Sequence, residues 1–212
     1  GMVGVVLGLL LVFRTNRTYE RWWEARTLWG ALVNTSRNQA IKVTSLVHPP
    51  ASDRRQVESI IIGIPYALMY HLRNGCQLIQ VPGFESSVQT PQHVPAYLVS
   101  LLYDFFHKWQ KSELISDDEL RILDREASNV LEIVGGCERI RSTLISSSYR
   151  RFIRQLIFLH LATVPWGLVD QFGDMTVMIV TIEAYFMIGI EAIAHAIEEP
   201  FGIEEDDLAL NT

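Results

Sequence analysis

Two ionisable side chains, His160 and Glu183, lie in the middle of long apolar stretches of the sequence. A charge inside a membrane helix is costly unless it is paired or faces water. An imidazole and a carboxylate in such a setting can form a buried hydrogen bond or relay a proton. Antiparallel pairing of the two stretches would bring these residues together, and we predict a buried polar contact in preference to a proton relay.

The sequence contains no combination of residues that is typical of an enzyme. Six histidines are scattered singly along the chain: His48, His71, His93, His107, His160 and His195. None has HxxxH or HExxH spacing, Ser146–Ser148 lack a GxSxG elbow, and Gly135-Gly136 is not a phosphate loop. The two cysteines, Cys76 and Cys137, have no CxxC spacing and indicate neither a zinc site nor a disulfide framework. We therefore expect a protein that is not an enzyme, and we identify no metal site from local spacing.

The composition favours a membrane protein over a soluble one. Hydrophobic residues make up 49% of the 212 residues although 20% are charged, and the mean hydropathy is +0.16. The net charge of -6 argues against a nucleic-acid partner, because such binders normally have a basic face.

The chain opens with an apolar run, Val3 to Phe13, that leads directly into a segment rich in Trp, Arg and Glu. Aromatic rings and arginines are typical of the headgroup level, where a helix leaves the bilayer. The run has only about thirteen apolar residues, whereas a full span needs roughly 20. Either this helix does not cross alone or helical turns are missing at its front.

Helix signals dominate the first two thirds of the chain, and no alternating strand pattern persists. We expect helices over 3–44, 54–73, 96–111 and 120–134, with a loop over 80–95. Ser52-Asp53 is the predicted N-cap of the second helix, and Ser116 with Glu119 forms a predicted capping box for the fourth. Pro65 should kink the second helix, and Gly135-Gly136 should stop or bend the fourth.

The last third contains two apolar stretches, 152–169 and 175–197, joined by a turn at 171–174. Each has about 18 to 23 residues, close to the length of a membrane span. We predict an antiparallel hairpin whose basic end, with Arg150, Arg151 and Arg154, faces the cytoplasm. The alternative is a pair of buried helices in a soluble bundle.

Motifs throughout the chain point in one direction. Residues 13–30 read FRTNRTYERWWEARTLWG and continue through 32–38, YAL at 66–68 precedes HLR at 71–73, GCERI occupies 136–140, and PFG at 200–202 precedes DDL at 206–208. In this order they resemble the bestrophin family of membrane ion channels. In one departure, residues 143–146 lack the Thr-Pro-x-Pro turn usual after GCERI, so the passage into the next helix should be more continuous.

The resemblance implies an all-α fold in which membrane helices and a cytosolic helical bundle assemble around a central axis. The chain would be one bestrophin-like domain over 1–212 that lacks the family's first membrane helix. Its approximate parts would be a pore-lining helix with a cytosolic extension at 1–45, cytosolic helices at 52–150, a membrane hairpin at 151–197 and an acidic tail at 198–212.

A narrow hydrophobic neck is the central feature that the resemblance implies. Bestrophins assemble as homopentamers whose second membrane helix lines this neck, and the matching positions are Val5, Leu9 and Phe13. Their i, i+4, i+8 spacing places them on one helix face. On residue pattern alone, contact with lipid or with neighbouring helices would be the preferred explanation of these side chains, because their neighbours in the run are equally apolar.

Two further sites are expected from the resemblance. A cytosolic constriction precedes the GCERI helix; Ile115 is our placement, Leu114 and Leu120 are alternatives, and ordinary packing of Ile115 explains its type as well. In the tail, Asp206 and Asp207 are candidate cation contacts, since vertebrate members have a calcium clasp in this region. A solvated acidic tail is the simpler interpretation, and we predict no other cofactor.

The expected function is therefore a channel for chloride or other small monovalent anions. The alternatives are a cation-conducting bacterial homologue and a non-conducting membrane scaffold. The expected location is a bacterial inner membrane, or a thylakoid or plastid membrane in a photosynthetic lineage, and the expected partners are monovalent ions, lipid and further copies of the chain.

Overall fold

The computed structural model describes residues 2–143 and 146–210 and is all-α, without a strand in those residues. Six α-helices follow one another along the chain: α1 (Met2–Lys42), α2 (Ala51–Arg73), α3 (Val94–Lys111), α4 (Asp117–Ser142), α5 (Ser147–Phe172) and α6 (Met175–Ala196). A π-helical turn, η1 (Val43–Val47), extends α1, and a 3-10 turn, η2 (Leu78–Gln80), lies in the long loop before α3. The all-α prediction is confirmed, while the predicted departure at 143–146 includes residues 144 and 145, which lie outside the described residues.

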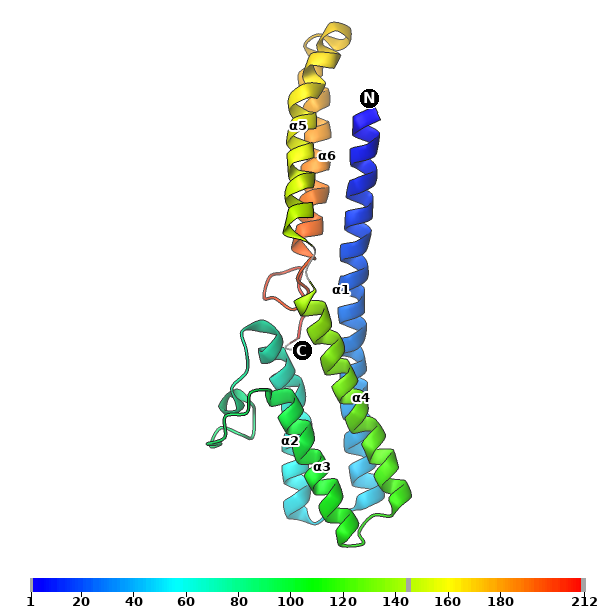
Figure 1. The fold of residues 1–212 in the computed structure, drawn as a ribbon, viewed down its shortest axis with the longest axis vertical. Coiled ribbons are helices and arrows are strands. Elements are labelled where there is room, and N and C mark those ends of the chain that lie inside the picture. The colour runs from blue at the N-terminus through cyan, green and yellow to red at the C-terminus, as the bar shows by residue number, and fades with distance from the viewer. Residues whose placement is uncertain (1, 144–145, 211–212) are drawn as a thin grey trace. The chain divides into compact units, whose positions relative to one another are not determined.

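The chain divides into two compact units. One contains Gly1–Glu24 and Thr143–Leu208, and the other contains Ala25–Ser142 and Ala209–Thr212. In the first, α5 and α6 run side by side as a hairpin, and in the second, α2, α3 and α4 pack together (Figure 1). Helix α1 supplies its first half to one unit and its second half to the other.

Packing between α2 and α3 forms the core of the second unit. Leu68, Leu98, Leu102 and Phe106 are fully buried on these helices. Gly63 is required at one close approach, because a Cβ atom there would lie 2.8 Å from Cγ1 of Val81. The core is therefore made by the apolar faces that the 3.6-residue period predicts.

Two of the predicted helix boundaries are wrong. Helix α2 begins at Ala51 after Pro50, without a side-chain cap, because the carboxylate of Asp53 is buried against α3 instead. Helix α4 continues through Gly135-Gly136 to Ser142, and Gly136 leaves room for Leu28 of α1, whose Cδ1 would lie 2.9 Å from an added Cβ. The glycine there permits close helix contact and is not a stop signal.

The start of α4 and the hairpin agree with the sequence. The amide of Glu119 donates to Oγ of Ser116 at 3.3 Å, and the amide of Ser116 donates to the Glu119 carboxylate at 2.8 Å, which completes the predicted capping box. Gly173, with a φ of 50°, ends α5 directly before α6 begins.

Asp53 of α2 is held by several hydrogen bonds from α3. Lys108 Nζ donates to both carboxylate oxygens at 2.8 Å, and the Trp109 indole N–H donates to Oδ2 at 3.0 Å. These hydrogen bonds, that from Lys108 first, hold the pKa of the Asp53 carboxyl below its usual value. The stabilisation is therefore fully present above the unfolded-state pKa of about 3.9 and is lost as pH falls through the lower folded-state value.

We expect Asp53→Asn to lower stability at neutral pH by about 1.5–3 kcal/mol, the range for hydrogen bonds to charged groups. Its thermal unfolding should also depend less on pH between about 5 and 3 than that of the unchanged protein. Asp118→Asn is the matched control, since Asp118 is exposed and only faces Arg121 at 3.6 Å. If the unfolding temperatures of the Asp53→Asn and unchanged proteins changed identically with pH, the contact of Asp53 with Lys108 and Trp109 would contribute nothing to stability.

Candidate functional site

The first half of α1 has two opposite faces of different character. Val5, Leu9 and Phe13 are 75%, 55% and 56% exposed, whereas Leu7, Leu11, Arg14 and Thr18 are at most 2% exposed. At about 100° per residue, the centres of the two stripes lie about 170° apart around the helix. The three predicted neck residues thus share the one face that the rest of this unit leaves uncovered.

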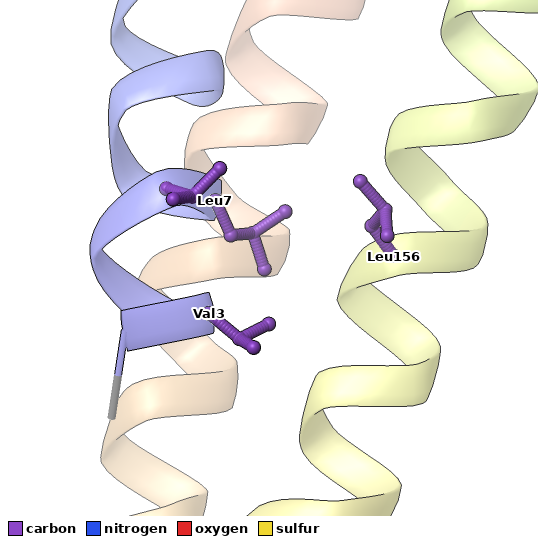
Figure 2. A pocket seen from close by; sticks show the side chains of 4 residues that line it. Val3, Leu7 and Leu156 are labelled. Atoms are coloured by element: carbon purple, nitrogen blue, oxygen red, sulfur yellow. The ribbon is translucent and has the colours of Figure 1, made fainter.

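The buried stripe of α1 packs on α5 within the first unit. Leu7 and Leu11 form an apolar cluster with Ile153 and Ile157. Beside it, a cavity of about 200 Å³ is lined by Val3, Val6, Leu7 and Leu156. Figure 2 shows the side chains of Val3 and Leu7 on α1 and that of Leu156 on α5. All four lining residues are aliphatic, so the cavity offers no group for acid–base chemistry or ion coordination.

Directly after the predicted neck in sequence, the buried face of α1 carries a charged residue, Arg14. The guanidinium of Arg14 is fully buried; its Nη1 donates to Glu191 Oε1 at 3.0 Å, and its Nη2 lies 3.7 Å from Glu198 Oε2. Arg154 Nε donates to the same Glu191 oxygen at 2.7 Å, and Arg150 Nη1 lies 3.4 Å from Glu198 Oε1. The carboxylates of Glu191 in α6 and of Glu198 just after it therefore pair with three arginines, one from α1 and two from α5.

Arg14 is the residue that sequence reasoning missed. From the sequence, headgroup water or an arginine of the first helix can reach Glu191 and Glu198-Glu199, and Arg21 and Arg26 are the candidate partners. Arg14 binds Glu191, whereas Arg21 donates to the main-chain oxygen of Thr143 and interacts electrostatically with Glu198 and Glu199. The available signal was the spacing of Arg14 from Leu7 and Leu11, which places all three on one face.

The predicted contact between His160 and Glu183 is confirmed. His160 Nε2 lies 2.8 Å from Glu183 Oε1, and the imidazole is buried. Gly4 of α1 lies against this ring, since a Cβ atom there would be 3.2 Å from His160 Cε1. The pair satisfies the polar atoms that would otherwise be costly in an apolar helix.

Helices α5 and α6 are long and apolar enough to cross a bilayer, with mean hydropathies of 1.4 and 1.9 over their most apolar 18 residues. Only 17% and 11% of those windows are buried within the protein. A core helix of a soluble protein would be mostly buried, so their apolar surface needs lipid or another chain to cover it.

Ile115 lies in the turn between α3 and α4 and is 4% exposed, whereas Leu114 beside it is exposed. Burial in the core of its own chain favours ordinary packing for Ile115. The cytosolic constriction stays a prediction, and of the three alternatives Leu114 has the most accessible side chain.

The tail uses its acidic residues to shape a turn. Asp207 Oδ2 accepts the amide hydrogen of Glu204 at 2.6 Å and leaves no room for a side chain at Gly202. The main-chain oxygen of Asp206 accepts the indole N–H of Trp22 at 3.2 Å. Calcium takes roughly six to eight oxygen ligands, and the tail of the described chain does not gather a metal-ligand cluster. Cation binding by Asp206 and Asp207 stays a prediction.

The comparisons with known proteins agree with the bestrophin-like sequence motifs. Residues 1–212 match the family model described as bacterial/fungal bestrophin protein. A voltage-dependent anion channel-forming protein of Ralstonia nicotianae is 33% identical over 100% of this chain and 71% of its own length. One of Synechocystis is 32% identical over 98% of this chain and 70% of its own length.

The fold is also similar to that of a solved structure. The crystal structure of a bacterial bestrophin homologue from Klebsiella pneumoniae gives a TM-score of 0.88 at 21% identity, covering 99% of this chain and 80% of that one. At that identity the likeness establishes the fold alone.

Proposed function

The chain belongs to the bacterial and fungal bestrophin family, and on that premise we propose that it forms a membrane channel for chloride and other small monovalent anions. The observation that carries the proposal is the uncovered apolar face of α1 formed by Val5, Leu9 and Phe13. The names of its relatives, which are voltage-dependent anion channel-forming proteins, support anion transport.

Several copies of this chain are needed to turn that face into a conduit. In a homopentamer, five α1 helices would converge and present three stacked rings of apolar side chains. Such rings control conduction by wetting and dewetting and do not coordinate the ion. The aromatic edge of Phe13 is electropositive and would favour an anion over a cation as it passes.

The proposed location is a bilayer crossed by α5 and α6, a bacterial inner membrane or the thylakoid of a photosynthetic lineage. The proposed orientation puts Arg150, Arg151 and Arg154 at the cytoplasmic side. The exposed apolar surface of both helices supports insertion into lipid. In a pentamer, part of the exposed apolar surface of α5 and α6 would contact lipid, and the rest would contact neighbouring subunits.

We expect the purified protein to elute in detergent as a five-subunit particle and, in liposomes, to release trapped chloride. The two measurements are light scattering of the detergent complex and chloride efflux, with empty liposomes as the control. A reversal potential set by the chloride gradient supports an anion channel, whereas one set by the potassium gradient supports the cation-conducting alternative. A five-subunit particle without flux would instead leave a membrane scaffold.

A further inference from the structure

Three side chains from distant parts of the sequence meet in the second unit. His71 lies near the end of α2, His93 is the N-cap of α3, and Glu138 lies on α4. His71 Nε2 and His93 Nε2 lie 2.7 Å and 2.6 Å from the same carboxylate oxygen, Glu138 Oε1. Their possible ligand atoms all lie within 4.8 Å of one another, and no other such group of His, Cys, Asp and Glu occurs in residues 2–143 and 146–210.

We propose that His71, His93 and Glu138 form a binding site for a divalent transition-metal ion of the zinc class. Two imidazole nitrogens and one carboxylate oxygen are a donor set that suits Zn²⁺. The ligands of one tetrahedral zinc lie about 3.3 Å apart, so the two N···O separations need to widen by only about 0.6 Å. All three side chains are half-buried, which leaves a fourth position open to water.

The donor types of the site, acting against a nearby positive charge, select among metals. Arg141, one turn after Glu138, donates to the main-chain oxygens of His71 and Arg73 at the end of α2. A guanidinium at this place opposes ions such as Ca²⁺ and Mg²⁺, which proteins hold through oxygen and charge alone. The same charge repels Zn²⁺ equally, but imidazole nitrogen binds zinc more strongly than it binds these hard cations and so offsets the repulsion.

Binding would be coupled to the start of α3. Without metal, His93 Nδ1 accepts the amide hydrogen of Ala96 at 3.1 Å, so the ring proton sits on Nε2 and is donated to Glu138. A metal on Nε2 displaces that proton, and Nδ1 takes one up, so the neutral ring changes tautomer without net proton release. The capping hydrogen bond to Ala96 is then given up in exchange for the metal bond.

The test is zinc titration calorimetry on the whole 212-residue chain in detergent, purified with a histidine-free tag and stripped with a chelator. We expect one equivalent of Zn²⁺ per chain, and binding at least about 100-fold weaker in His71→Ala, His93→Asn and Glu138→Gln, since even indirect supports of a metal ligand contribute 10–100-fold. His93→Asn keeps a side chain that can cap α3, so it removes the ligand while preserving the fold.

His107→Ala is the matched control, because His107 is an exposed histidine on the same helix, α3. It should bind Zn²⁺ as the unchanged protein does. Equal binding by the His93→Asn, His71→Ala and unchanged proteins, or the absence of a zinc equivalent in the unchanged protein, would overturn the proposal and leave a hydrogen-bonded triad.

Discussion

Alanine in place of Leu9 should raise chloride flux through proteoliposomes about tenfold. That factor corresponds to a barrier lower by about 1.4 kcal/mol. This is small beside the combined hydrophobic contribution of five leucine side chains in a narrow pore. Phe13→Ala should act in the same direction, because both residues lie on the uncovered face of α1. The measurement is the initial rate of chloride efflux per pentamer.

Matched controls lie on α5, where exposed residues of the same types occur. Leu159→Ala and Phe158→Ala remove the same side chains from another apolar exposed surface. They should leave flux unchanged, since lipid contact does not set the barrier to an ion. If all four variants conduct like the unchanged protein, α1 does not form the constriction.

Removal of the Arg14 guanidinium should have the largest effect on stability. Arg14→Leu leaves Glu191 and Glu198 short of a buried cation, and breaking such a cluster from one side costs about 3–5 kcal/mol. We expect a much lower thermal unfolding temperature in detergent and loss of the oligomer peak. Arg14→Lys, which keeps the charge but not the forked geometry, should recover part of the loss.

Arg17→Leu is the control for this prediction. Arg17 lies one turn from Arg14 on the same helix but pairs with Glu20 at 3.5 Å in an exposed position. Exposed pairs of this kind contribute about 0–1 kcal/mol, so its unfolding temperature should match the unchanged protein. Equal stability of the Arg14→Leu and Arg17→Leu proteins would contradict the role given to the buried cluster.

Local patterns were sufficient to predict most of the helices. Each of these patterns involves only residues that are close together in the sequence. Examples are the apolar periodicity of 54–73, the capping box at Ser116 and Glu119 and the short turn at Gly173. Each can be recognised without knowing what packs against it. The contact between His160 and Glu183 could also be predicted, because a short turn between two antiparallel helices brings the middle of one beside the middle of the other.

The errors come from residues whose partners are distant in sequence. Asp53 has the type of an N-cap but binds Lys108 and Trp109, and Gly136 has the type of a helix stop but makes room for Leu28. Short-range rules give the local preference, and tertiary packing decides between that preference and its alternatives.

The polar clusters were hidden from sequence for the same reason. Arg14 and Glu191 are 177 residues apart, and the zinc-class site joins His71, His93 and Glu138 from three helices. No motif with fixed spacing describes either set. The predicted neck stripe of α1 differs from these clusters, since its i, i+4, i+8 spacing and the adjoining bestrophin-like motif both lie within a single helix, and its role in a pore stays a prediction.

The most direct test of the neck is block of chloride flux by a membrane-impermeant thiol reagent in Leu9→Cys protein. The native thiols interfere little, because Cys137 is buried and burial raises the pKa of the Cys76 thiol to about 11, which leaves little reactive thiolate at neutral pH. We predict block in Leu9→Cys and full flux in Leu159→Cys. Unaltered flux through fully modified Leu9→Cys protein would contradict the assignment of this face to the conduction path.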